Sequence, residues 1–231
     1  MFGPIKNIIF DMDGTLISSM KTAIRGILES IEAGSGKKVD AELLPLGRTP
    51  QMIIRDFVPE KSWDTALAYW ENFEINIFEH IEVFAGVPEL LNYLHSKKIF
   101  MSIYTGRDRL GTTRILEHKK WIPKFFNHEL LRCGDDLTGH KPSPLPIDDL
   151  CKKYKLEKKH TLMVGDHVVD AAAAKGAGVL FGAALWDLPG SEKQTFRSRY
   201  AESWSRWDGV EVQLKLPTPL SLKEYFEGTL T

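Results

Sequence analysis

Four short polar sets contain the residue types in this chain that could do chemistry. In chain order they are Asp11-Met12-Asp13-Gly14-Thr15, Thr105-Gly106-Arg107, Lys141-Pro142 and Gly165-Asp166-His167-Val168-Val169-Asp170. Together these sets supply several carboxylates, one amine and one hydroxyl. Carboxylates brought into one site repel one another unless a cation compensates them. A hard divalent cation such as Mg²⁺, which takes oxygen ligands from carboxylates and from substrate phosphate, would remove that repulsion.

The cationic and hydroxyl members of these sets suit an anion held beside such a metal. The Lys141 amine and the Thr105 hydroxyl can donate to anionic oxygens. A helix beginning shortly after Gly106 would add backbone donors and its positive dipole end. Zn²⁺ is disfavoured, because Cys133 and Cys151 are the two cysteines and no cysteine or histidine pattern has metal-ligand spacing.

Strands and helices alternate along the part of the chain that must position these sets. Apolar runs at 5–10, 99–104 and 161–164 predict strands directly before the first, second and fourth sets. A last clear strand is expected at 179–181, and a weaker strand signal lies at 129–132. Helical patterns cover 87–96, 108–119, 146–154 and 168–175. This alternation predicts an α/β fold, a parallel sheet with helices on both faces. Ligands bind such sheets beyond the carboxyl ends of the strands, where these sets fall.

Residues 18–83 have helical periodicity and few strand signals, which indicates an insertion after the first strand. Three helices are expected there, at about 18–34, 50–57 and 62–81. We therefore predict a catalytic core of residues 1–17 and 84–231 and a small all-helical cap domain of residues 18–83. In the tail after Trp186 we expect an amphipathic helix over 190–207, a strand over 210–216 and a short helix over 221–226, without recognisable chemistry.

Composition narrows the classes of partner. The chain has 231 residues, is 43% hydrophobic and has a formal net charge of -1, so it offers no broad basic field for nucleic acid. No apolar run is long enough to span a membrane, and the N-terminus lacks the pattern of a signal peptide, so the cytoplasm is the expected location. A small anionic molecule is the expected partner, and the chain could be a monomer or a homodimer.

In this order and context, the four sets resemble the four motifs of the haloacid dehalogenase superfamily. Within it the chain is similar to the phosphoglycolate phosphatase-like hydrolases, whose helical cap is inserted after the first strand. The resemblance extends from about Ile5 to Gly182, and the segments 84–91 and 170–178 also look like the family's cap exit and its fourth-motif helix. One Asp-x-Asp-Gly-Thr run is a weak signal, but four motifs in order are specific.

The resemblance implies a Rossmann-like core and a Mg²⁺-dependent hydrolase of a small phosphorylated metabolite, a phosphate monoester. It makes Asp11 the nucleophile that forms an aspartyl-phosphate. Asp13 becomes the general acid that protonates the leaving oxygen and then the base that activates water.

The same resemblance implies the metal ligands and the anion donors. Its metal set comprises Asp11, the Asp13 carbonyl, Asp166 and Asp170, the last as a ligand or as a holder of metal-bound water. Its donors to the phosphoryl oxygens are Thr105, Lys141 and the Gly106 backbone.

Other interpretations of single residues stay open. Aspartate and glycine after a strand are ordinary turn residues, and a lysine before proline can be a solvated loop cation. Asp170 could merely cap the alanine-rich helix that follows it. Arg48 lies in a cap loop and is either a substrate contact or a surface cation.

Competing functions also stay open. A phosphomutase resembling β-phosphoglucomutase would use a basic or histidine cap residue soon after the first motif, where Lys21 and Arg25 occur but no histidine. A phosphonate hydrolase would need a cap lysine for imine formation, for which Lys21 is a weak candidate. Dehalogenation is a weaker alternative, because it needs no acid at the position of Asp13. A non-enzymatic binding module is weaker as well, because its motif residues would not need to be chemically competent, as they are here.

Overall fold

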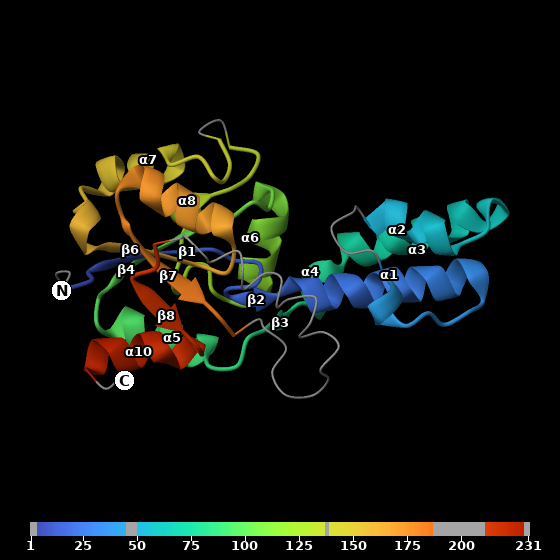
Figure 1. Ribbon diagram of the computed structural model, residues 1–231, viewed down its shortest axis with the longest axis horizontal. Helices are drawn as coiled ribbons and strands as arrows, with labels where there is room; N and C mark the ends of the chain where they lie inside the picture. Colours follow the sequence, from blue (N-terminus) through green and yellow to red (C-terminus); the bar gives the residue numbers. More distant parts are fainter. Residues whose placement is uncertain (1–3, 45–49, 137–138, 187–210, 229–231) are drawn as a thin grey trace. The chain divides into compact units, whose positions relative to one another are not determined.

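The computed structural model describes residues 4–44, 50–136, 139–186 and 211–228, shown in Figure 1. The chain divides into two compact units, residues 1–18 with 83–231 and residues 19–82. Arg48 and the predicted helix over 190–207 lie outside the described residues.

The larger unit contains a six-stranded sheet in the order β5-β4-β1-β6-β7-β8, and every neighbouring pair is parallel. Its strands are β1 (Asn7–Phe10), β4 (Phe100–Tyr104), β5 (Leu131–Arg132), β6 (Thr161–Gly165), β7 (Leu180–Ala184) and β8 (Leu214–Leu216). Its helices are α5 (Val87–Ser96), α6 (Arg109–His118), α7 (Leu145–Tyr154), α8 (Val168–Ala177) and α10 (Pro219–Glu227). The predicted α/β fold is therefore confirmed.

The sheet is covered on both faces. Helices α7 and α8 pack together over one face, and α5 and α10 pack together over the other (Figure 1). A strand covered on both faces is mostly apolar. The central strand β1 has four buried residues in succession, of which three are apolar, and the polar one, Asn7, donates to Thr161 Oγ1 at 3.1 Å. Burial of Ile8, Ile9 and Phe10 stabilises this strand by roughly 1.5–3 kcal/mol per side chain.

Strand β1 lies between β4 and β6 in register, with Phe10 opposite both Ile103 and Val164. The three strands therefore end at the same level. The weak strand signal at 129–132 is realised only at its end: a 3-10 turn, His128–Leu130, precedes the two residues of β5.

The smaller unit is helical, with α1 (Ser19–Ser35), α2 (Pro50–Phe57), α3 (Trp63–Ile75) and α4 (Ile77–His80), together with 3-10 turns at Ala41–Leu43 and Glu60–Ser62. Helix α1 packs on α2 and α3. Gly26 has no side chain, which leaves room for the Phe73 ring against α1. Trp70 is buried as well.

The expectation of one continuous helix over 62–81 was wrong, because α3 ends at Ile75. The Asn76 side-chain amide donates to the carbonyl of Asn72 at 2.9 Å. The backbone N–H of Asn76 donates to the same carbonyl at 3.3 Å. Such local side-chain bonds compete with the regular helix pattern.

Two short strands, β2 (Ile17–Ser18) and β3 (Glu82–Val83), pair in a separate two-stranded sheet where the chain leaves and rejoins the larger unit. Among the described residues, no helix is both long enough and apolar enough to cross a membrane.

Candidate active site

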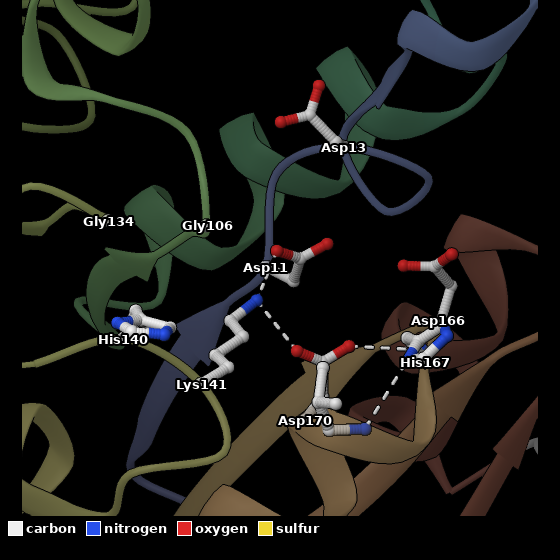
Figure 2. Close-up of a pocket in the computed structure, with 10 residues that line it drawn as sticks. Asp11, Asp13, Gly106, Gly134, His140, Lys141, Asp166, His167 and Asp170 are labelled. Atoms are coloured by element: carbon white, nitrogen blue, oxygen red, sulfur yellow. Dashed lines mark hydrogen bonds and ion pairs between the residues drawn. The ribbon is translucent and has the colours of Figure 1, made fainter. Parts of the chain in front are cut away.

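The carboxyl ends of β1, β4 and β6 bring most of the predicted motif residues to one pocket. Asp11 follows β1 directly, Thr105 follows β4, and Asp166 follows β6. Lys141 reaches the pocket from the loop before α7 (Figure 2). The cavity has a volume of about 510 Å³ and is lined by Asp11, Asp13, Gly106, Gly134, His140, Lys141, Asp166, His167, Val169 and Asp170.

Three carboxylates in this pocket form a group that could hold a metal ion. Oxygens of Asp11, Asp166 and Asp170 lie within 4.8 Å of one another. A set made only of carboxylate oxygens fits a hard cation such as Mg²⁺ better than Zn²⁺. The donor set is therefore compatible with the metal that the motifs imply.

Two glycines make room for these carboxylates. A Cβ on Gly14 would overlap the Asp166 carboxylate, and the φ of +85° at Gly14 also disfavours any other residue. A Cβ on Gly165 would overlap the Asp170 carboxylate. The glycines of the first and fourth motifs thus let the acids approach closely.

Lys141 connects two of the three acids. Its Nζ pairs with Asp11 Oδ1 and lies 2.6 Å from Asp170 Oδ1, and its side chain is only 7% exposed. The amine also lies 5.4 Å from the ring centroid of Tyr104, whose hydroxyl donates to the Ser143 carbonyl at 2.9 Å. Tyr104 therefore helps to hold both Lys141 and its loop, a role that the sequence pattern did not indicate.

Burial and charge set the protonation of this cluster. Burial raises the pKa of Asp11 to about 6, although the Lys141 ammonium opposes the shift and Asp170 adds to it. For Lys141, burial alone would lower the pKa, but Asp11 and Asp170 outweigh it and the pKa rises. The lysine is therefore a permanent cation at neutral pH.

The loop after Asp11 folds back on itself. The Met12 carbonyl accepts from the backbone N–H groups of Leu16 and Ile17 at 2.8 and 3.0 Å. The Thr15 hydroxyl lies 3.2 Å from Asp11 Oδ2 and 3.3 Å from Asp166 Oδ1, so it connects the first and fourth motifs.

Trp186, just after β7, anchors the same loop. Its indole Nε1–H donates to the Thr15 carbonyl at 2.8 Å. The sequence pattern gave this tryptophan no role, because the bond joins residues 171 positions apart.

Asp13 lines the pocket, but its side chain is turned away from Asp11 and Lys141 (Figure 2). Arg107 holds this carboxylate with two bonds, Nε to Oδ2 at 3.1 Å and Nη2 to Oδ1 at 2.5 Å. Burial alone would lower the pKa of Arg107, but Asp13 outweighs it and the pKa rises. Sequence reasoning left Arg107 unassigned; its place directly after Thr105-Gly106 was the available signal.

Asp170 and His167 form the N-terminal cap of α8. Asp170 Oδ2 accepts from the His167 backbone N–H at 3.0 Å, and His167 Nδ1 accepts from the Val169 N–H at 3.4 Å. Asp170 therefore caps the helix, as one of the two interpretations expected, and it also pairs with Lys141. Its role at a metal stays a prediction.

The predicted site residues thus differ in where the structure places them. Asp11, Lys141, Asp166 and Asp170 converge, and Asp13 and Gly106 line the same pocket. Thr105 is fully buried, and its hydroxyl accepts from the Arg107 backbone N–H at 3.1 Å.

The raised pKa of Asp11 predicts how the stability of the metal-free protein depends on pH. Unfolding returns this pKa from about 6 to 3.8, so the folded state binds more protons between those values. The free energy of unfolding is therefore expected to fall as the pH rises from about 4 to about 6, by at most about 3 kcal/mol. Denaturant melts in chelator, compared between wild type and Asp11→Asn, isolate this effect. A difference between the two proteins that stays constant over this range would contradict it.

The fold and the acidic pocket define an α/β enzyme whose site lies at the carboxyl ends of a parallel sheet. Residues 8–184 match the haloacid dehalogenase-like hydrolase family, and the chain belongs to that family.

Relatives with named activities lie at moderate identity. The chain is 30% identical over 188 residues to the pyrophosphatase PpaX of Oceanobacillus iheyensis, covering 80% of this chain and 85% of that protein. It is 25% identical over 195 residues to the phosphoglycolate phosphatase of Nitrosospira multiformis, covering 76% and 81%. A solved structure of a family hydrolase from Deinococcus radiodurans R1, with bound phosphate and sodium, aligns with a TM-score of 0.75 at 18% identity, covering 98% and 96%.

Proposed function

We propose that this chain is a Mg²⁺-dependent phosphatase that hydrolyses a small-molecule phosphate monoester through an aspartyl-phosphate on Asp11. The observation that carries the proposal is the position of Asp11, buried at the end of the central strand and held between Lys141 and Thr15. The named activities of the relatives, which release phosphate from pyrophosphate or phosphoglycolate, support the same chemistry.

Each residue has a defined part in this proposal. Asp11 attacks phosphorus, and Asp13 turns inward to protonate the leaving oxygen and later to deprotonate water. Lys141 neutralises the phosphoryl oxygens together with the Gly106 backbone. The Thr105 hydroxyl accepts in its bond to the Arg107 N–H, so its proton can be donated to the same oxygens.

Asp11, Asp166, Asp170 and the Asp13 carbonyl would hold Mg²⁺, with Asp170 acting directly or through water. The ion would supply charge stabilisation for the phosphoryl group. We also propose that residues 19–82 serve as a cap that excludes water during the reaction, as such closing domains do.

Removal of the metal is expected to abolish turnover. In EDTA, phosphate release from p-nitrophenyl phosphate should fall by at least about 10³-fold, because the phosphoryl charge loses its main compensation. Added Mg²⁺ should restore it, and calorimetry should show Mg²⁺ bound by the wild-type protein.

A matched pair of variants assigns the metal to the pocket. Asp166→Asn should weaken Mg²⁺ binding at least about tenfold. Asp64→Asn, the same change on an exposed acid of α3, should leave it unaltered. Full activity in EDTA, or equal metal binding by both variants, would contradict the proposal.

The phosphomutase alternative gains no support from the two cations near the first motif. Lys21 Nζ lies 3.6 Å from a Glu82 carboxylate oxygen, and Arg25 pairs with Glu29 at 3.7 Å. Both are therefore paired within their own helical unit. Isomerisation of a sugar phosphate in the presence of a bisphosphate primer would reveal mutase activity.

A further inference from the structure

The ion pair between Arg107 and Asp13, which lines the pocket, has no part in the reaction described above. It is bidentate, and the two side chains are only 21% and 30% exposed. While Asp13 is held in this way, its carboxylate points away from Asp11 (Figure 2). It must therefore leave Arg107 before it can reach an oxygen bonded to phosphorus at Asp11.

Arg107 itself is fixed in place. Its backbone N–H donates to Thr105 Oγ1 at 3.1 Å, and its carbonyl accepts from the Gly134 N–H at 2.9 Å. A Cβ on Gly134 would overlap the Gly106 carbonyl, so this backbone contact is close. These contacts fix the Arg107 backbone, so we expect its guanidinium to stay within reach of the position that Asp13 leaves when it turns inward.

A largely buried arginine that loses its carboxylate is costly unless another anion replaces it. Asp108 and Asp11 also help to stabilise the Arg107 charge, but the Asp108 carboxylate already caps α6 by accepting from the Gly111 N–H at 2.7 Å. The charges of Asp11, Asp166 and Asp170 would be balanced by Lys141 and a divalent ion. A second anionic group on the substrate can supply the bidentate contact that Asp13 leaves.

We propose that Arg107 binds a second anionic group on the leaving-group side of the substrate, in exchange for Asp13. This inference rests on the proposed phosphatase function and narrows its substrate class. The preferred substrates are small phosphate compounds whose leaving group has its own carboxylate or phosphoryl group close to the bridging oxygen. Binding of that anion releases Asp13 for proton transfer, so only such substrates fully engage the acid.

The test compares two substrates of similar size, phosphoglycolate and ethyl phosphate, which differ by the carboxylate on the leaving group. Arg107→Gln should lower kcat/KM for phosphoglycolate about 10- to 100-fold more than for ethyl phosphate. Arg107→Lys should recover part of the kcat/KM for phosphoglycolate that Arg107→Gln loses, because lysine keeps the charge but not the bidentate geometry. Arg114→Gln, an exposed position on α6, is the matched control and should change neither value.

A second measurement separates anion binding from proton transfer. 3-Phosphonopropionate and propylphosphonate are uncleavable analogues of the two substrates, so their competitive inhibition constants do not depend on Asp13 as an acid. Arg107→Gln should weaken inhibition by the first about tenfold or more and leave the second nearly unchanged.

Three results would each overturn the role of Arg107. The first is an equal loss of kcat/KM for both substrates in Arg107→Gln, and the second is an inhibition constant of 3-phosphonopropionate that is the same for the wild type and Arg107→Gln. The third is a wild-type enzyme without preference for phosphoglycolate over ethyl phosphate. Failure of the wild-type protein to hydrolyse p-nitrophenyl phosphate would instead overturn the phosphatase function itself.

Discussion

Replacement of Asp11 by asparagine is expected to lower kcat by at least about 10⁴-fold while the protein stays folded. An amide of the same size fits the buried site, and it can still accept a hydrogen bond from Lys141 or Thr15. It cannot attack phosphorus, so the covalent route is lost. Phosphate release with Mg²⁺ measures the loss, and a thermal melt confirms the fold.

Asp64→Asn provides the control for this change, because it removes an exposed carboxylate from α3. Its kcat should equal that of the wild type. Acid-quenched wild-type enzyme should also retain covalently bound phosphate during turnover, and Asp11→Asn should retain none. A variant within tenfold of wild-type activity would rule out Asp11 as the nucleophile.

Replacement of Lys141 by methionine is expected to have two separate effects. The loss of a cation that neutralises the phosphoryl oxygens should lower kcat/KM by about 10²–10³-fold. In the metal-free protein, Asp11 and Asp170 would also lose their shared buried partner, which should reduce the free energy of unfolding by about 3–5 kcal/mol.

Magnesium separates these two effects. In Lys141→Met, a cation bound among Asp11, Asp166 and Asp170 should recover much of the free energy of unfolding but little of the activity. Denaturant melts with and without Mg²⁺ and steady-state kinetics provide the two readouts. Lys152→Met, at an exposed position on α7, controls for the change of residue type. If Lys141→Met were as stable as wild type in EDTA, the pairing role of the lysine would be wrong.

The fold followed from patterns that the sequence displays locally. Continuous apolar runs predicted the buried strands, and the polar residues after β1, β4 and β6 marked the edge where they meet. Parallel strands in register end together, so the convergence of Asp11 and Asp166 required no knowledge of side-chain angles. This explains why the position of the pocket could be inferred before its geometry.

Other features depend on tertiary geometry that spacing does not encode. The pairing of Arg107 with Asp13 joins residues 94 positions apart through the direction of two side chains. The contact of Lys141 with Tyr104 depends on how the loop before α7 lies against the end of β4. The break at Asn76 arises from a side-chain bond that competes within an otherwise helical pattern.

The pairing of β2 with β3 has a consequence for how this chain tolerates insertion. Residues 19–82 leave and return through adjacent strands, so the ends of the inserted segment are already close together in space. The entropic cost of closing such a loop rises only with the logarithm of its length, by about 0.6 kcal/mol for each doubling. A shorter or longer segment could therefore replace residues 19–82 at little cost to the folding of the sheet.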